Sequence, residues 1–401
     1  PAPRRTSRPL SSWPWIRQPA PVLDFVLNPF AWLFGTGTTT VAPLAAADAI
    51  VPGGSEATDE PALNALGQAP AGPVDGATTI VDDGWLLPGL VDAHNHVGIA
   101  PGLGVTVEQA RAFAYADVAA GTTLIREVGS PLDTHPLDDD PRCPQFIRSG
   151  KHIARPKRYL RDYGVDLDDP DDLAAEVTRQ AAAGDGWVKI VGDWIDRDAG
   201  DLAPLWTRAQ LDAAVAAAHG AGAKITAHVF GYDALPDIIG AGFDCIEHGT
   251  GLTDDLIDEV VARDIALVPT MIQIENFPGI ADGADRFPTY QATMRDLYAR
   301  AGQVMAAARE AGVQIFAGTD AGGFVGHGRI VDEVEALVAM GMPVSEALDA
   351  ASAAARRWLG AGVFDDGDRA DVLILDADPR EDLSALRRPR EIICGGVPIR
   401  G

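Results

Sequence analysis

Two histidines separated by one residue lie near the end of the apolar run "LLPGLVDAHNHVGI" at residues 86–99. Alternate residues of an extended strand share one face, so the imidazoles of His94 and His96 point the same way and Asn95 points the opposite way. Burying two imidazoles costs free energy unless each ring nitrogen has a partner. A metal ion is one partner that engages both rings. The alternative is a pair of core histidines that are hydrogen-bonded to the backbone.

Polar residues that suit a metal site also occur in four other short apolar runs. Lys189 lies in "GWVKIVG" and His228 in "AKITAHV", while His248 lies in "FDCIEHG" and Asp320 ends "VQIFAGTD". Barrel enzymes build their active sites at the carboxyl ends of the barrel strands. Together with the first histidine pair these residues would converge on one rim, which favours a metal centre over core histidines.

The remaining four of the eight histidines do not lie at the ends of expected strands. His219 lies at the end of a predicted helix, where the helix dipole favours a cation. His135 and His152 fall in loops rich in proline or charge, and His327 falls in a glycine-rich loop. None of these four is predicted to bind metal.

Imidazole and carboxylate ligands without cysteine suit zinc, and manganese, cobalt and iron remain open. Lys189 is the exception, because an ammonium group has no lone pair for a metal. Converted to a carbamate, its side chain would present two oxygens to a pair of cations. Unmodified, it would form a salt bridge with Asp320 or play a structural role. The spacing leaves these alternatives open.

Short apolar runs alternate with Ala-rich helical patterns, such as those at 207–222 and 253–264, from about residue 88 onward. This alternation is typical of βα units with a parallel sheet. Eight repeats over roughly 270 residues match the size of a (β/α)8 TIM barrel. The expected strands are 89–96, 122–129, 144–150, 186–192, 223–229, 243–249, 264–270 and 313–320.

The composition limits the partners and the compartment. The 401 residues include 32 basic and 58 acidic side chains, a net charge of −26 that argues against a nucleic acid or an anionic membrane as partner. The three cysteines lie far apart without C-x-x-C spacing, so a reducing, cytoplasmic location is expected. The apolar stretch at 23–35 contains a proline, is too short to span a bilayer and precedes no convincing cleavage site.

Several motifs in this order resemble the amidohydrolase superfamily, in the branch that contains imidazolonepropionase-like and prolidase-like enzymes. They are "LLPGLVDAHNH", "WVKI", "ITAHV", "CIEHG", "FAGTDAG" and the tail "GDRADVLILDADPREDLSALRRPREIICGGV", within about 84–401. The resemblance implies a barrel at 88–360 and a small β-sandwich built from both chain ends, 1–87 and 361–401. The first 80 residues fit the family's opening strands poorly.

The resemblance also implies a binuclear centre of two divalent ions, with zinc as the expected metal. The more buried ion would be held by the first histidine pair and Asp320. The second ion would be held by the histidines of strands five and six, with a carboxylated lysine as the bridge. The residues that match these positions are His94, His96, Lys189, His228, His248 and Asp320.

Such a centre implies hydrolysis of an amide C–N bond. Two cations that share one water lower its pKa from about 15.7 towards 7, which supplies hydroxide. Asp320 would accept the proton of this water and deliver it to the leaving nitrogen. A lactone, cyclic-amide or carbamate hydrolase is the alternative on the same centre. A non-catalytic scaffold and a one-metal deaminase fit less well, because every ligand position is filled and a deaminase does not need the lysine.

A basic stretch in this acidic chain points to the substrate. "RSGKHIARPKRYLR" at 148–161 contains no acidic residue and follows the third expected strand, so it would lie near the mouth of the barrel. Arg155 and Arg158 are the candidates for binding an anionic substrate, such as a carboxylate-bearing N-acyl amino acid or a dipeptide. A solvated loop or a subunit interface is the alternative.

Three further residues are candidates for substrate contacts. Met271 opens the long connection 271–290, which would form a lid or pack against a second subunit of a homo-oligomer. His327 lies in the glycine-rich loop after the last expected strand. Phe230 follows the fifth strand in "AHVFG", where similar dipeptide hydrolases often have "AHAYG" with a substrate-binding tyrosine. Phe230 has no hydroxyl, so that contact cannot be assumed.

Overall fold

The structure is a computed structural model that describes residues 80, 83–100, 103–365 and 367–399. Most of the N-terminal half of the predicted β-sandwich, namely residues 1–79 and 81–82, and with it the apolar stretch at 23–35, therefore lies outside the described residues. In the part of the chain that the structure covers, no helix is both long and apolar enough to cross a membrane.

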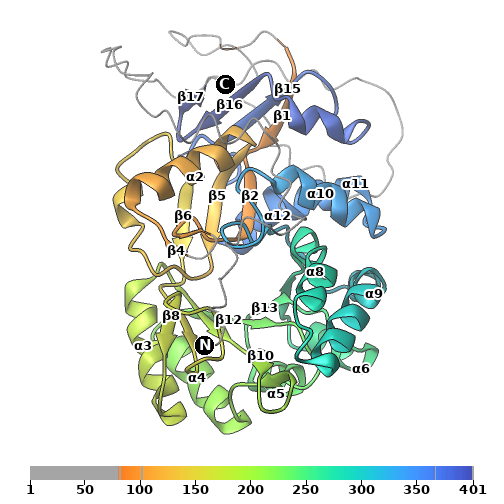
Figure 1. The fold of residues 1–401 in the computed structure, drawn as a ribbon. Coiled ribbons are helices and arrows are strands. Elements are labelled where there is room, and N and C mark those ends of the chain that lie inside the picture. The colour runs from red at the N-terminus through yellow and green to blue at the C-terminus, as the bar shows by residue number, and fades with distance from the viewer. Residues whose placement is uncertain (1–79, 81–82, 101–102, 366, 400–401) are drawn as a thin grey trace, which may run out of the picture. The chain divides into compact units, whose positions relative to one another are not determined.

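Two parallel sheets form the centre of the described chain (Figure 1). One sheet has the order β2-β5-β6, and the other has the order β14-β13-β12-β9-β7-β8. Their strands are mostly buried runs of aliphatic residues, as expected for parallel strands covered on both faces. They are β2 (Leu90–Asn95), β5 (Thr122–Glu127), β6 (Gln145–Arg148), β7 (His152–Ala154), β8 (Gly164–Asp166), β9 (Trp187–Val191), β12 (Lys224–Val229), β13 (Cys245–His248) and β14 (Ala266–Val268).

Seven of the eight expected strands are confirmed, and the eighth is not a regular strand. Residues 313–320 make only an isolated bridge between Ile315 and Leu267 of β14. On the other side, Ala93 N donates to Ala317 O over 2.9 Å and Asp320 N donates to His94 O over 2.7 Å. This segment therefore joins β14 to β2, although it forms no continuous ladder. The fold is α/β with parallel sheets, and the closed eight-stranded barrel stays a prediction.

Helices connect most of the parallel strands and pack on one another along the chain. The predicted helices at 207–222 and 253–264 are confirmed as α4 and α6. Thr207 and Gln210 form a capping box that fixes the start of α4. The helices are α2 (Val107–Ala119), α3 (Leu173–Ala183), α4 (Arg208–Gly220), α5 (Leu235–Ala241), α6 (Asp254–Ala262), α7 (Met271–Ile274), α8 (Phe277–Asp282), α9 (Pro288–Ala311), α10 (Ile330–Ala339), α11 (Val344–Ala350) and α12 (Ala353–Trp358).

Short elements complete the connections. The expected loop at 271–290 is largely helical, because it holds α7, α8 and the start of α9. Two hairpins and three single-turn helices lie between the larger elements. They are β3 (Ile99–Ala100), β4 (Leu103–Gly104), β10 (Asp193–Asp196), β11 (Asp201–Pro204), η2 (His135–Leu137), η3 (Pro170–Asp172) and η4 (Leu383–Arg387).

A separate antiparallel sheet combines a segment that precedes the parallel core in the sequence with segments that follow it. Its order is β1-β15-β16-β17, so a strand that precedes β2 pairs with strands near the end of the described chain. Trp85 is opposite Leu375, and Pro88 is opposite Val372. The strands are β1 (Trp85–Pro88), β15 (Val372–Leu375), β16 (Glu391–Cys394) and β17 (Val397–Ile399). The domain boundaries at 87 and 360 stay predictions.

Candidate metal centre

The structure brings the predicted ligand residues to one edge of the parallel strands. His94 lies in β2 and His96 just after it, while His228 lies in β12 and His248 ends β13. All four imidazoles are at least 96% buried, which is unusual for so many polar groups in one region. Parallel strands have their carboxyl ends on the same side, so the strand positions alone place these side chains together.

The first group of ligand atoms surrounds the carboxylate of Asp320. Nε2 of His94 and Nε2 of His96 each lie 3.1 Å from Asp320 Oδ1. Ligand atoms of these three residues all lie within 4.8 Å of one another. Two ligands of a tetrahedral ion with bonds of 2.0–2.1 Å lie about 3.3 Å apart, so this group needs little movement to hold a cation.

The second group consists of two histidines on neighbouring strands. His248 Nε2 lies 3.0 Å from His228 Nδ1, and His248 Nδ1 lies 2.7 Å from the hydroxyl of Thr270. The rings of His94 and His248 are 5.0 Å apart between centroids, so the two groups adjoin. The histidine pair turns two ring nitrogens toward one point, as a second cation site requires.

The backbone at two ligand residues has an uncommon conformation. His248 has φ 68° and Asp320 has φ 57°, in the left-handed region that non-glycine residues seldom occupy. Such strain persists only where the surrounding contacts fix it, and it is often found at functional sites. At Asp320, the hydrogen bond from its backbone N–H to His94 O is one such contact.

Lys189 is a buried residue of β9 beside these two groups. Burial lowers the pKa of Lys189 to about 8, although the carboxylates of Glu247 and Asp320 act in the opposite direction. Among the described residues it forms no ion pair with Asp320. The salt bridge that was the alternative role of this lysine is therefore not formed.

Burial also sets the charge of the other ligands. It lowers the pKa of His96, and it lowers the pKa values of His228 and His248 far below the ordinary value, so these rings are neutral and keep a lone pair. Burial alone would raise the pKa of Asp320. Electrostatic attraction to His94 and hydrogen bonds from both His94 and His96 instead hold the pKa of that carboxyl well below its usual range.

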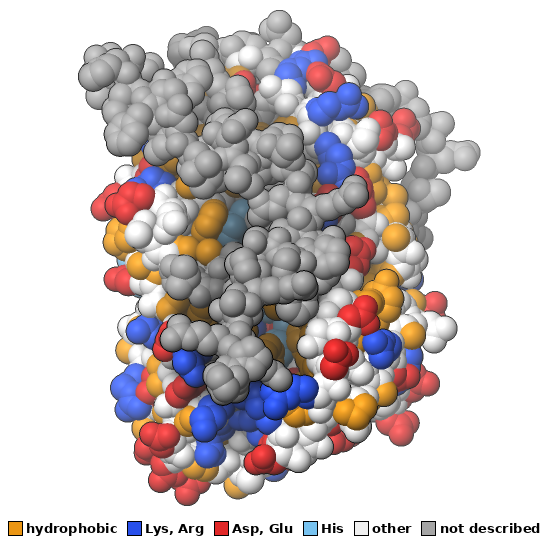
Figure 2. Space-filling view, in the orientation of Figure 1, with side chains coloured by type: hydrophobic (Ala, Val, Ile, Leu, Met, Phe, Trp, Pro, Cys, Tyr) orange, Lys and Arg blue, Asp and Glu red, His pale blue; other side chains and the backbone are white. Residues whose placement is uncertain are grey.

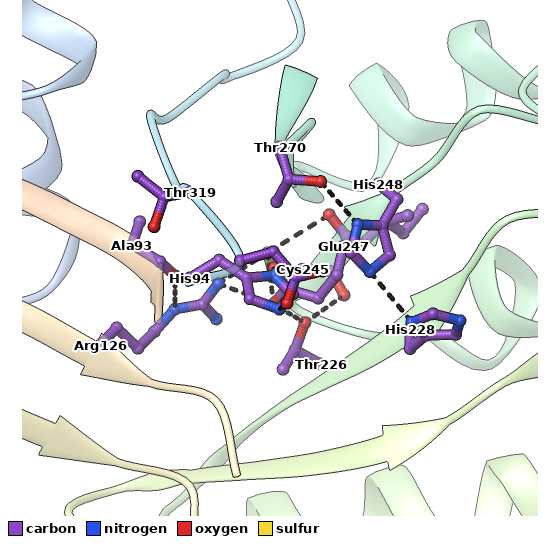
Figure 3. A network of polar contacts seen from close by, with 12 residues as sticks. Ala93, His94, Arg126, Thr226, His228, Cys245, Glu247, His248, Thr270 and Thr319 are labelled. Carbon is purple, nitrogen blue, oxygen red and sulfur yellow. Dashed lines mark hydrogen bonds and ion pairs between the residues drawn. The ribbon is translucent and has the colours of Figure 1, made fainter. Parts of the chain in front are cut away.

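A buried ion pair that the sequence analysis missed supports His94 (Figure 3). Glu247 Oε2 lies 2.7 Å from His94 Nδ1, and Glu247 Oε1 accepts a hydrogen bond of 2.7 Å from Arg126. Arg126 Nε also donates to Ala93 O over 2.7 Å. A carboxylate on Nδ1 orients an imidazole so that Nε2 is free to bind metal. The only sequence signal was a charged residue inside each of two apolar strands.

The backbone carbonyl of Gly129 orients His96, and Gly129 is a second supporting residue that the sequence did not reveal. His96 Nδ1 lies 2.8 Å from Gly129 O. A Cβ at Gly129, which has φ 111°, would lie 2.6 Å from Nδ1 of His152. His152 is wholly buried in β7, and its ring centroid lies 5.2 Å from that of His96. The prediction that His152 lies in a loop rich in proline or charge is wrong, because this residue belongs to β7 and is a buried neighbour of the candidate ligands.

The predicted substrate residues fall at different distances from the ligands. Phe230 contacts His228 and His248, with ring centroids 4.3 and 4.6 Å apart. Met271 starts α7, where its N–H donates to Glu333. His327 contacts Asp117 through Nδ1 over 2.9 Å and, within the described residues, makes no hydrogen bond or ring contact with a predicted ligand. Of these three, only Phe230 directly contacts the candidate centre.

The two predicted anion-binding arginines are already engaged by the protein. Arg158 donates to Asp196 over 2.8 Å and to two backbone carbonyls of the β10–β11 hairpin. Arg155 donates to Asp168 O over 3.3 Å. Figure 2 shows Lys and Arg side chains gathered on the lower part of one face, over β8 and β10. Neither arginine contacts a predicted ligand, so their role in substrate binding stays a prediction.

The donor set fits divalent cations. Three of the histidines, His94, His96 and His248, have Nδ1 oriented by a second protein group, which leaves Nε2 for a ligand bond. A carboxylate and a lysine complete the set, and cysteine sulfur is absent from it among the described residues. This combination suits zinc or a similar ion.

Comparisons with known proteins identify the family of this chain. A model of the Amidohydrolase family matches residues 85–397. An uncharacterized protein of Mycobacterium tuberculosis is 56% identical over 324 residues, which cover 81% of this chain and 88% of that protein. A Xaa-Pro dipeptidase structure with bound methionine is 25% identical, with a TM-score of 0.68 and coverage of 80% of this chain and 88% of that one.

A more distant structure shares the fold. Ochratoxinase of A. niger is 20% identical with a TM-score of 0.68, over 79% of this chain and 83% of that one. Together with the ligand geometry, these matches indicate a hydrolase that acts on a small molecule. The chain belongs to the Amidohydrolase family.

Proposed function

We propose that the protein is a metal-dependent hydrolase that cleaves an amide C–N bond. The observation that carries this proposal is the approach of Nε2 of His94 and of His96 to the same oxygen of Asp320, each over 3.1 Å. Both rings already have Nδ1 engaged by Glu247 or Gly129, so Nε2 is the nitrogen left for a cation.

Two divalent ions, with zinc as the expected metal, fit the two groups of ligand atoms. The proposed ligands are His94, His96, Lys189, His228, His248 and Asp320. When bound, such ions lower the pKa of a shared water towards 7 and polarise the acyl oxygen of the substrate.

Lys189 fits the bridging position if it is carboxylated. Carbamate formation requires the neutral amine, and burial lowers the pKa of Lys189 to about 8. The amine is therefore neutral in a substantial fraction of molecules near pH 8. A carbamate would also replace a buried cation by a group with two oxygen donors, which suits its place among cation ligands.

Asp320 fits the role of the group that moves the proton. Its carboxyl is ionised at neutral pH, because His94 and His96 hold its pKa well below the usual range. An ionised carboxylate beside the attacking water accepts a proton and then delivers it to the leaving nitrogen. Amide cleavage needs this second step because an amide anion is a poor leaving group.

The proposed substrate is a carboxylate-bearing N-acyl amino acid or a dipeptide. The basic residues of 148–161 support an anionic substrate, and a structure 25% identical to this chain is that of a Xaa-Pro dipeptidase. The aromatic ring of Phe230, 4.3 Å from that of His228, offers an apolar contact for the rest of the molecule.

A substrate panel on the zinc-loaded protein tests this function. The panel contains dipeptides, N-acyl amino acids, their neutral esters, lactones and cyclic amides. We expect hydrolysis of the acyl amino acids or dipeptides, lost on treatment with a chelator and restored by zinc. Turnover confined to lactones or cyclic amides would contradict the proposed bond class, and activity that survives complete metal removal would contradict the metal dependence.

A further inference from the structure

A buried carboxylate on α10 binds the backbone that follows β14. Glu333 belongs to the first turn of α10 and is fully buried. Its two oxygens accept hydrogen bonds from the backbone N–H groups of Met271, over 2.8 Å, and of Ile272, over 2.9 Å. Both donors belong to the start of α7. Glu333 therefore joins α7 to a helix that supplies none of the proposed metal ligands.

This carboxylate takes the role of an N-cap for α7. The first N–H groups of a helix have no partner inside the helix, and a threonine in the N-cap position usually accepts one of them through its hydroxyl. Thr270 occupies that position, but its side chain does not cap α7. Its hydroxyl instead lies 2.7 Å from Nδ1 of His248 (Figure 3). Because Glu333 satisfies the start of α7 from another helix, the hydroxyl of Thr270 is available to His248.

The backbone of Thr270 has a conformation that needs support. Its φ of 49° and ψ of 53° lie in the left-handed region, which β-branched residues rarely occupy. Such a conformation persists only where the surrounding contacts fix it. The two hydrogen bonds of Glu333 are made to the two residues that directly follow Thr270. They therefore help to fix the backbone from which the hydroxyl projects.

The orientation of the His248 ring depends on that hydroxyl. At His94 the group that contacts Nδ1 is the carboxylate of Glu247, and at His96 it is a backbone carbonyl. At His248 it is a hydroxyl, whose position changes with the backbone and with χ1 of its residue. A group that holds the second nitrogen of a histidine ligand fixes the direction of the ring toward the metal. A shift at the start of α7 would therefore turn the ring of His248.

We propose that Glu333 is a positioning residue for His248, and that it acts through the start of α7 and the hydroxyl of Thr270. This inference rests on the metal centre of the proposed function. Glu333 makes no hydrogen bond with a proposed ligand in the described part of the chain, so its effect on the metal passes through Thr270. Its loss should weaken the cation held by His228 and His248 and spare the other cation.

Zinc titration of the metal-free protein against a chromophoric chelator tests this role. Glu333→Gln keeps the size of the side chain, but it places an NH₂ donor against one of the two N–H groups. We expect one of the two zinc ions to bind about 10-fold more weakly, at the low end for groups that orient a ligand, and the other to change less than about twofold. Glu335→Gln is the matched control on the same helix, because the side chain of Glu335 is 41% exposed and pairs with Arg387. Both zinc affinities should be those of the wild type in this control.

Substitutions of Thr270 show whether the effect passes through its hydroxyl. Thr270→Val removes the hydroxyl and keeps the shape, so it should weaken the same ion about 10–100-fold, whereas Thr270→Ser should restore most of the affinity. In the double variant, Glu333→Gln should add less than about twofold to the effect of Thr270→Val, because residues that act through one contact are not additive. Glu333→Asp, which shortens the reach of the carboxylate, gives the same comparison where glutamine prevents folding.

Three results would overturn the proposal. They are wild-type zinc affinities in both Glu333 variants, equal weakening of both ions, and full additivity of Glu333→Gln with Thr270→Val. Failure of the proposed function is a separate outcome, in which the wild type binds no zinc, and the inference then falls with it.

Discussion

Replacing Glu247 by glutamine tests whether the buried ion pair behind His94 supports the centre. Glu247 accepts a hydrogen bond from Arg126 over 2.7 Å, and both side chains are fully buried. Burial alone would raise the pKa of Glu247, but the charges of Arg126, His94 and Lys189 hold it well below its usual range. Glutamine keeps the size of the side chain and removes its charge.

The expected loss of unfolding free energy follows from the contacts that Arg126 keeps after the substitution. Arg126 stays buried, with Nη1 already unpaired among the described residues, and would lose its only carboxylate partner there. The rings of Trp187 and Trp358 lie 4.5 and 4.9 Å from its guanidinium carbon and remain in place, but they do not neutralise the charge. Removing one partner of a buried ion pair costs about 3–5 kcal/mol of unfolding free energy.

An exposed pair with the same separation provides the control. Arg387 and Glu335 also lie 2.7 Å apart, but their side chains are 44% and 41% exposed. Such pairs contribute about 0–1 kcal/mol. Urea unfolding of the metal-free protein, followed by circular dichroism, should therefore separate Glu247→Gln from Glu335→Gln by several kcal/mol.

A second readout concerns the metal. His94 would lose the carboxylate on Nδ1, and removal of such a partner lowers metal affinity about 10–100-fold. Competition with a chromophoric chelator measures this change. If Glu247→Gln were as stable as the Glu335→Gln control and bound zinc as tightly as the wild type, the reasoning about this ion pair would be refuted.

Three further predictions concern the reaction and the pH dependence. Asp320→Asn should lose about 10³-fold in kcat, within the range for general acid–base groups, while zinc stays bound; a near wild-type rate would exclude the proton-transfer role. Arg155→Glu combined with Arg158→Glu should raise KM for anionic substrates only, and an equal effect on neutral esters would argue against anion recognition. Burial raises the pKa of Glu333 from 4.5 to about 8. The stabilising contribution of the protonated carboxyl is therefore fully present at pH values below the pKa of Glu333 in the unfolded chain, and it is lost as the pH rises through about 8. Unfolding free energies at several pH values should therefore fall more steeply between about pH 5 and pH 9 in the wild type than in Glu333→Gln, and parallel curves would contradict the shift.

The ligand positions could be predicted because strand ends are visible in the sequence. An apolar run that ends in a histidine identifies both the strand and the residue at its carboxyl end, as for His228 and His248. The supporting residues give no such signal. Glu247 and Arg126 lie inside strands, and their pairing depends on which strands face each other across the core.

Tertiary contacts account for what the sequence alone could not show. The basic stretch 148–161 stays a candidate for anion binding, but its first residue, Arg148, is buried and is paired with Asp138 and Asp185. Those partners come from separate connections, so the sequence alone could not show the neutralisation. The eighth strand was predicted from its apolar pattern. Residues 313–320 instead join β14 and β2 through two backbone hydrogen bonds to each strand, and the backbone at Asp320 is left-handed.

Zinc stoichiometry is the most direct test of the central claim, that side chains from separate strands hold two cations at one site. Elemental analysis of the zinc-loaded protein should give about two ions per chain in the wild type and one or fewer in Lys189→Ala. A Tyr298→Phe variant on the exposed face of α9 should match the wild type. A wild-type protein that binds no zinc, or a Lys189→Ala variant that keeps the full complement, would contradict the account.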